Sequence, residues 1–328
     1  MTSSNFSLAL LSDTQFYAEY DELTPILSKT NQWIVDHKED FNLKAVLHEG
    51  DLVQHNVHPD WKRAIQGMQP LHGKLPVYYT LGNHDLGSTG EIAVDRHTHF
   101  NDYFNLEDNH LATPHLGGLL NDGELQNAYY TFEENGEKFM VMCLEFGPRD
   151  SVVSWALGIA KSHPDHHIIL LTHDFIDHRS TLLSEDGRPE RSVPDTPNSP
   201  HLYGIAEDPD QPNCGEELWK KLVSQTPNFI LVCNGHYKRF EEYNGRYVGL
   251  LEGMVHTFRS DTTPHGNTVN QMCFNAQWCP QGGDGWFRLL TFDTSVRQIQ
   301  VRTISPYRKG FDGFDELEDE ENQFTIQY

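Results

Sequence analysis

The chain has 328 residues, of which 37% are hydrophobic and 11% aromatic, so it is long enough and apolar enough to bury a full core and is not a disordered chain. Its formal net charge of −24 at pH 7 repels phosphate backbones, which makes general nucleic-acid binding unlikely and favours a small or localised substrate. We interpret the acidic excess itself as a solvated surface.

The N-terminus, MTSSNFSLALLSD, lacks a basic region, and its apolar stretch from Phe6 to Leu11 is too short for a signal or membrane segment. We therefore expect a mature protein that starts near Met1, stays in the cytoplasm and does not enter a membrane. The five cysteines are odd in number and lack paired metal-type spacing, which indicates free thiols in a reducing compartment.

The first part of the chain alternates apolar runs typical of strands with stretches of helical spacing. The strand-like runs are Ser7 to Leu11, Leu43 to Leu47 and Pro76 to Leu81, and the helical spacing is clearest between Leu23 and Ile34. This order predicts a β-α-β-α-β unit. Functional loops of such units gather at the C-terminal ends of the strands, and each of these strands runs into a polar cluster there.

The pattern loosens beyond Gly87, where a His-rich and Gly-rich stretch of about 87–126 predicts a lid or surface insertion. A second stretch, about 176–212, reads as a long loop, and loops of that length are usually functional or mobile. Helices are expected at 151–162 and 216–223, with strands at 128–132, 138–146, 167–172, 229–233, 286–292 and 299–304. We expect a single domain at 1–310 and an acidic, solvated C-terminal tail at 311–328.

Polar clusters that contain oxygen or imidazole donors follow the predicted strands. Divalent cations of hard or borderline character prefer such donors, and a strand end holds them more rigidly than a free loop. Glycine beside a ligand permits a tight turn. The clusters are Asp13-Thr14-Gln15, Gly50-Asp51, Gly82-Asn83-His84-Asp85, Thr172-His173-Asp174 and Asn234-Gly235-His236.

In their order and spacing these clusters resemble the motifs of the calcineurin-like metallophosphoesterases: D-x-H, GD, GNH[DE], a lone His and GHxH. The closing segment from Gly282 to Leu290 is similar to the end of a bacterial subgroup in which Gln replaces the first-motif His. The resemblance implies an α/β fold, a four-layer α/β/β/α sandwich of two facing mixed β-sheets flanked by helices. It also implies a site for one or two divalent metal ions.

Carried over residue by residue, the resemblance implies that Asp51 bridges two metals. Asp13 would complete one site, with Gln15 where His is usual, and Asn83, His173 and His236 would complete the other. His84 would lie over the substrate and assist the leaving oxygen, with Asp85 orienting its ring. A metal-bound hydroxide would attack phosphorus, so no Ser or Cys nucleophile is needed.

Two positions depart from the family pattern, and both belong to the first metal. Gln15 replaces the usual His, and Lys238 replaces the second His of GHxH. An amide oxygen ligates weakly, whereas a protonated ammonium cannot ligate and repels a cation. The first site is then weak, differently completed or empty, and His55, His256 or His265 are candidates for the missing nitrogen.

Lys238 has two open interpretations: its charge weakens the first metal site, or it binds a phosphate oxygen of the substrate as a point charge. Arg239 and His265 are further candidates for substrate binding. Taken singly, Asp13 is also consistent with a helix cap and Asp51 with an ordinary turn. His173 alone is also consistent with a strand-end histidine whose hydrogen bonds are satisfied within the protein. Aromatic residues such as Phe16 and Trp278 are more often core or rim packing than substrate platforms.

The sequence therefore predicts a metal-dependent hydrolase of phosphate mono- or diesters that acts on a small phosphorylated substrate. The alternatives are a phosphoprotein phosphatase and a non-catalytic metal-binding or partner-binding protein on the same scaffold. Manganese, iron, zinc and nickel all accept this donor set, so the sequence does not name the metal. It leaves the substrate and the oligomeric state open as well.

Overall fold

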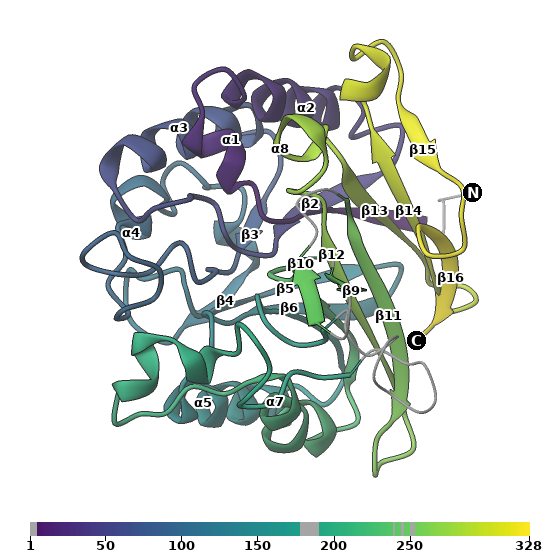
Figure 1. Cartoon of the computed structure of the whole chain (residues 1–328). Helices are drawn as coiled ribbons and strands as arrows, with labels where there is room; N and C mark the ends of the chain where they lie inside the picture. Colours follow the sequence, from purple (N-terminus) through teal and green to yellow (C-terminus); the bar gives the residue numbers. More distant parts are fainter. Residues whose placement is uncertain (1–4, 178–189, 239, 244–245, 250–252) are drawn as a thin grey trace.

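Two β-sheets face each other at the centre of the molecule in the computed structural model (Figure 1), which describes residues 5–177, 190–238, 240–243, 246–249 and 253–328. The first sheet has the order β15-β14-β13-β1-β2-β3, with β16 also pairing with β14. Parallel pairing of β1 with β2 and of β2 with β3 confirms the predicted β-α-β-α-β unit. Its strands are β1 (Asn5–Leu11), β2 (Leu43–His48), β3 (Val77–Tyr79), β13 (Phe287–Asp293), β14 (Gln298–Ser305), β15 (Asp315–Leu317) and β16 (Gln323–Gln327).

The second sheet has the order β11-β12-β8-β7-β6-β5-β4 and is also mixed, because β6, β7, β8 and β12 run parallel while its outer pairs are antiparallel. Its strands are β4 (Leu116–Leu119), β5 (Ala128–Glu134), β6 (Glu137–Cys143), β7 (His166–Leu171), β8 (Phe229–Asn234), β11 (Val255–Thr262) and β12 (Thr268–Asn275). A separate hairpin consists of β9 (Phe240–Tyr243) and β10 (Arg246–Gly249).

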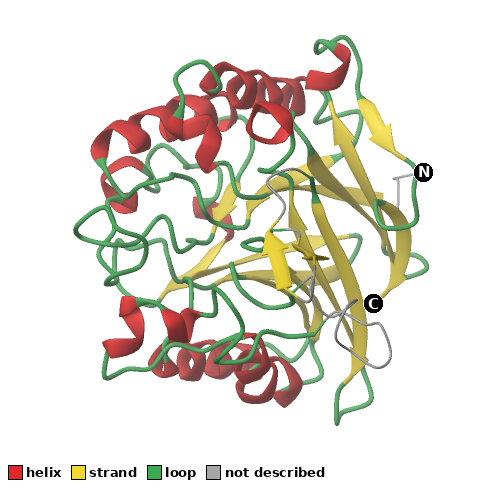
Figure 2. Ribbon diagram, in the orientation of Figure 1, coloured by secondary structure: helices red, strands yellow, loops and turns green. Residues whose placement is uncertain are grey.

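Helices cover the outer face of each sheet (Figure 2). Helix α2 buries Ile26, Leu27 and Ile34 against the first sheet because these residues recur at helical spacing on one side. Helix α5 buries Val152 and Ala156 against the second sheet in the same way. The helices on the first side are α1 (Gln15–Glu19), α2 (Thr24–Asp36), α3 (His58–Met68), α4 (Phe100–Tyr103) and α8 (Pro280–Gly283), and those on the second are α5 (Asp150–Ser162) and α7 (Gly215–Lys221).

The space between the sheets is filled by aromatic and aliphatic side chains from both. Phe6 of β1 stacks on Phe292 of β13 with ring centroids 4.7 Å apart, and it meets Phe139 of β6 edge-on at 5.0 Å. All three side chains are fully buried. The fold is therefore the predicted four-layer α/β/β/α sandwich with its central core between two mixed sheets.

The acidic C-terminal segment is not a solvated tail, and that prediction was wrong. Strand β16 pairs antiparallel with β14 over five register positions and buries Ile326, which is 6% exposed. Strand β15 pairs with the other end of β14. Two apolar residues, Phe324 and Ile326, alternate with polar neighbours in β16, which suffices to seat an edge strand although the surrounding composition is acidic.

The structure describes all of the first predicted insertion, 87–126, and part of the second, 176–212. The stretch 87–126 contains α4 and the edge strand β4, and it buries Phe100 and Phe104 in the core below the first sheet's helices. Of the stretch 176–212, residues 178–189 lie outside the described part, while Ile205 in the remainder is 1% exposed. Within the described ranges, no helix combines the length and apolarity that a membrane span requires.

Candidate metal centre

The predicted ligands come together where strands of the two sheets end. Asp13, Asp51 and Asn83 follow β1, β2 and β3 of one sheet, and His173 and His236 follow β7 and β8 of the other. Ligand atoms of Asp13, Asp51 and His173 lie within 4.8 Å of one another, and all three side chains are buried. The sandwich thus brings oxygen and nitrogen donors from both sheets to one point.

Tight turns hold these residues. Asp13, Asp51 and His236 have φ angles of 44°, 53° and 75°, in the left-handed region that non-glycine residues rarely adopt. Neighbouring glycines make room for them: a Cβ on Gly82 would lie 2.0 Å from Asp51 Oδ1, and one on Gly235 would lie 2.1 Å from Asp13 Oδ1. Strained backbone of this kind clusters at functional sites, where the surrounding structure holds it in place.

His173 is oriented as a metal ligand would be. Its Nδ1 lies 2.6 Å from the carbonyl oxygen of Glu49, to which it donates, and its Nε2 lies 3.2 Å from Asp51 Oδ2, so Nε2 is the nitrogen left for a cation once its proton is lost. An N–H of a ligating histidine that donates to a backbone carbonyl is the usual outer support of such a ligand. Burial lowers the pKa of His173, but Asp51 and Asp13 outweigh it and raise the pKa to about 10. The two carboxylates thus attract positive charge to this point.

Two amide side chains place oxygens at the centre. Gln15 donates from Nε2 to Asp51 Oδ2 at 3.1 Å, and Asn83 donates from Nδ2 to the Tyr203 hydroxyl at 3.4 Å. Their other ends, Gln15 Oε1 and Asn83 Oδ1, are buried and have no donor among the described residues. Buried acceptors without a donor cost free energy, and bound cations would satisfy them.

His236 lies beside this group, with its ring centroid 4.9 Å from that of His173. Its backbone N–H donates to both carboxylate oxygens of Asp13 at 3.2 Å, and its Nε2 lies 2.8 Å from the carbonyl oxygen of Asn198. Burial lowers the pKa of its imidazole to about 3, so the ring is neutral. With Nε2 donating to Asn198, Nδ1 is the nitrogen that can bind a metal.

His84 and Asp85 share a motif but have different surroundings. The backbone N–H of His84 donates to Asp51 Oδ1 at 2.9 Å, and its Nδ1 lies 2.8 Å from the carbonyl oxygen of Gln54. Asp85 accepts from the backbone N–H groups of Leu52, Val53 and Gly82 at 2.8 to 3.1 Å. Asp85 therefore links the loop that follows β2 to the loop that follows β3. Because the Asp85 carboxylate faces these backbone amides, which lack strand partners, the predicted contact with the His84 ring was wrong.

Asp13 has partners that sequence analysis missed. Asn275 Nδ2 donates to Asp13 Oδ2 at 2.6 Å, and Gln277 Nε2 does so at 3.4 Å. Burial raises the pKa of Asp13 to about 7, with His173 acting against the shift and Asp51 adding to it. Asn275 ends β12 and Gln277 follows it, and because this strand was not predicted, the polar cluster Asn275-Ala276-Gln277 at its end was not recognised as a sixth one.

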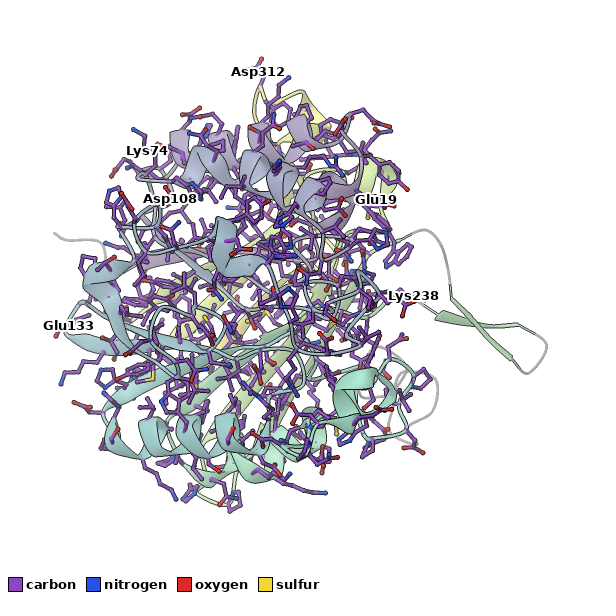
Figure 3. All side chains as sticks on the ribbon, turned by 90° about the vertical axis from the view of Figure 1, so that its left-hand side faces the viewer. Glu19, Lys74, Asp108, Glu133, Lys238 and Asp312 are labelled. Carbon is purple, nitrogen blue, oxygen red and sulfur yellow. The ribbon has the colours of Figure 1, made fainter. Side chains whose placement is uncertain are left out.

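A pocket of about 200 Å³ opens over this group. Lys238 lies at its rim with Nζ 5.5 Å from the centroid of the Trp278 ring, on the side of the molecule from which β9 and β10 extend (Figure 3). Arg239 is outside the described residues. The lining residues are Gln15, Phe16, Asp51, Gln54, Asn83, His84, Ile92, Asn198, Tyr203, His236, Lys238, Gln277 and Trp278.

The histidines proposed as substitute ligands do not line this pocket. His265 lies in the turn of the β11–β12 hairpin, between the paired residues Thr262 and Thr268, whereas the far end of β12 reaches the site. The eight residues of β12 therefore separate His265 from the site by roughly 23 Å. His256 lies on β11 with Nε2 2.6 Å from Glu321, and His55 is likewise absent from the lining. The suggestion that His256 or His265 supplies the missing nitrogen, and the role of His265 in substrate binding, were wrong, whereas the suggestion for His55 stays a prediction.

Solved structures similar to this chain include GAP50 of the inner membrane complex of Plasmodium (11% identity, 97% of this chain and 90% of that chain, TM-score 0.46). Others are the NAD nucleotidase NadN of Haemophilus influenzae (13%, 96% and 49%, 0.43) and a 5'-nucleotidase precursor from Thermus thermophilus (13%, 88% and 51%, 0.45). At these identities and scores the likenesses say nothing about the substrate of this chain.

A relative in sequence is the uncharacterized protein YvnB of Bacillus subtilis strain 168, which is 27% identical over 317 residues. The match covers 94% of this chain but spans only about a fifth (20%) of the length of that relative. A family model described as calcineurin-like phosphoesterase matches residues 6–249, which contain all the residues predicted as metal ligands. This chain belongs to the calcineurin-like phosphoesterase family.

Proposed function

We propose that the protein hydrolyses phosphate esters with one or two bound divalent metal ions. The observation that carries this proposal is the buried group of Asp13, Asp51 and His173, beside which acceptor atoms of Gln15 and Asn83 have no donor among the described residues. Bound divalent cations would supply Lewis-acid charge to phosphoryl oxygens and lower the pKa of water toward neutrality. The donor set fits such ions, and family membership supports the same chemistry.

Each residue has a proposed part in holding the reactants. Asp51 lies between the two halves of the site, because its Oδ1 faces the His84 loop and its Oδ2 faces Gln15 and His173. His173, His236 and Asn83 would hold one cation, and Asp13 with Asp51 and Gln15 would hold the other.

His84 is the proposed proton donor to the leaving oxygen. Its Nδ1 is held by the Gln54 carbonyl, so the ring is oriented, and its side chain lines the pocket. With Nδ1 donating to that carbonyl, Nε2 would carry a proton for the leaving group when the ring is an imidazolium. Hydrogen-bond reach to the substrate is the first requirement for such a role, and the position of His84 in the pocket lining supports it.

We propose a small phosphorylated substrate, since the pocket of about 200 Å³ has room for a phosphate and a modest alcohol portion. The net charge of −24 disfavours nucleic acid. A phosphoprotein phosphatase and a non-catalytic metal-binding protein on this scaffold are the alternatives. A reducing, cytoplasmic location belongs to the same proposal, supported by five cysteines that are all free.

The proposal is tested by elemental analysis of protein purified without chelator, followed by assay of that sample on aryl phosphate mono- and diesters. We expect one or two divalent ions per chain and metal-dependent release of the aryl alcohol. Bound metal without turnover of any ester would favour the non-catalytic alternative, and absence of bound metal even after incubation with manganese or zinc would overturn the metal site.

Lys238 is the proposed phosphate-binding cation of the pocket, and Lys238→His is expected to raise KM by about tenfold, a loss of about 1.4 kcal/mol of substrate binding. A flexible ammonium at the rim binds a phosphate oxygen well as a point charge. Steady-state kinetics measures the change, and metal titration of the same variant serves as control. Tighter binding of a second metal in the variant would instead favour the interpretation in which the ammonium repels that ion.

A further inference from the structure

Four side chains bring oxygen donors to the centre. Asp13 and Asp51 contribute carboxylates, and the amides of Gln15 and Gln277 line the same pocket. The imidazole of His173 lies beside that of His236, and its Nε2 is 3.2 Å from Asp51 Oδ2. The centre therefore offers a cation two kinds of donor, oxygen and imidazole nitrogen.

Gln277 is held in place by its neighbours. The side chain is 4% exposed, its backbone N–H donates to Asn275 Oδ1 at 2.9 Å, and its Nε2 donates to Asp13 Oδ2 at 3.4 Å. Its Oε1 is buried and has no donor among the residues that the structure describes. Because the nitrogen faces a carboxylate, the oxygen is the end that remains for a ligand.

Gln15 has the same arrangement on the neighbouring carboxylate. Its Nε2 donates to Asp51 Oδ2 at 3.1 Å, the side chain is 2% exposed, and its Oε1 is buried without a donor among the described residues. Two separate glutamines thus each use the amide nitrogen to bind a carboxylate of the cluster and leave the amide oxygen in the interior. A buried carbonyl without a partner is costly, and two whose amide nitrogens are both held by carboxylates of one cluster point to a shared cation.

We propose that Gln277 is the missing ligand of the first metal site, and that this site binds a hard divalent cation such as Mg²⁺ or Mn²⁺ through oxygen atoms of Asp13, Asp51, Gln15 and Gln277. The inference rests on the two-site arrangement in the proposed function. Carboxylate and carbonyl oxygens suit Mg²⁺ and Mn²⁺, whereas imidazole suits zinc and iron. The Lys238 ammonium can stay at the rim of the pocket when this cation binds, because it lies over the Trp278 ring, with Nζ 5.5 Å from the ring centroid.

The test uses metal-free full-length protein loaded with one equivalent of Zn²⁺ and then titrated with Mn²⁺ in a calorimeter. Wild type is expected to bind one further equivalent. Gln277→Leu removes the oxygen but keeps the size of the side chain, and its Mn²⁺ affinity should fall at least about tenfold, since loss of an outer partner alone costs about 10–100-fold. Gln277→Glu replaces the amide oxygen with a carboxylate oxygen, a harder ligand, and should bind Mn²⁺ more tightly than wild type does.

Gln54→Leu is the matched control, because Gln54 Oε1 is also buried without a described donor in the same pocket but bonds neither Asp13 nor Asp51. It should keep the wild-type affinity for Mn²⁺. Circular-dichroism melting curves identify a variant that fails to fold, in which case Gln277→Glu decides the matter alone.

Unchanged Mn²⁺ affinity in both Gln277 variants would overturn the inference, and so would a wild type that binds no ion after the first. These outcomes do not depend on turnover. A protein that hydrolyses esters with a single ion would contradict the inference alone, and one that binds both ions but hydrolyses nothing would contradict the proposed activity alone.

Discussion

Asp51→Asn should reduce bound metal and lower ester hydrolysis by at least about 10³-fold, since loss of one preorganised donor costs about 10²–10³ and this carboxylate serves both halves of the site. The two oxygens of Asp51 face the His84 N–H at 2.9 Å, Gln15 Nε2 at 3.1 Å and His173 Nε2 at 3.2 Å. An amide of the same shape loses the charge and turns an NH₂ group toward one of these nitrogen neighbours. Metal content by elemental analysis and rate on an aryl phosphate measure the result.

The fold should survive this change, because asparagine fills the same space beside Gly82 and leaves no unpaired buried charge. Asp60→Asn is the matched control: Asp60 is 5% exposed and accepts from the His55 N–H at 3.1 Å, but it lies on α3 outside the pocket. The control should keep its metal and activity. Normal metal content and full activity in Asp51→Asn would remove Asp51 from the site.

His84→Ala should keep the metal but lower turnover by about 10²–10⁴-fold, the usual contribution of a general acid. Metal is retained because the contact with Asp51 comes from the backbone N–H of residue 84, which the substitution leaves in place. The ring, which Gln54 orients through Nδ1, is lost. Elemental analysis and kcat on an aryl phosphate separate the two effects.

The dependence on the leaving group identifies the role of His84. A phosphate ester with an acidic phenol such as 4-nitrophenol needs no proton on departure, so His84→Ala should lose less rate on it than on phenyl phosphate. His97→Ala is a control, since His97 is exposed and does not line the pocket. Equal losses on both esters would assign His84 to positioning the phosphate, and an unchanged rate would remove it from the mechanism.

Local pattern was enough to find the strands and the ligand clusters that follow them. Each of β1, β2, β7 and β8 is an apolar run that is recognisable in a short window, and the residue after it is constrained by the turn that ends the strand. The parallel order of β1 and β2 places Asp13 and Asp51 at one edge, but β7 and β8 belong to the other sheet, and only the resemblance to the family assigned His173 and His236 to the same centre.

The partners of those residues depend on contacts between distant segments. Asn275 meets Asp13 across 262 residues of chain, and no local pattern relates the two. The same holds for Asn198, whose carbonyl orients His236, and for Gln54, whose carbonyl orients His84. Every residue type carries the same backbone carbonyl, so the sequence does not indicate which carbonyl will accept a given hydrogen bond.

The wrong predictions for Asp85 and His265 also arose because contacts between distant segments are not visible in the sequence. Asp85 was assigned to its neighbour in sequence, but in the fold its carboxylate meets three amides of ligand loops. His265 was a candidate by residue type alone, and the β11–β12 hairpin carries it away from the site. Residue types and strand order in the sequence thus determine which atoms can bind a metal and at which edge they lie. The packing of two sheets decides which donors complete the site, because it alone brings the end of β12 against the end of β1.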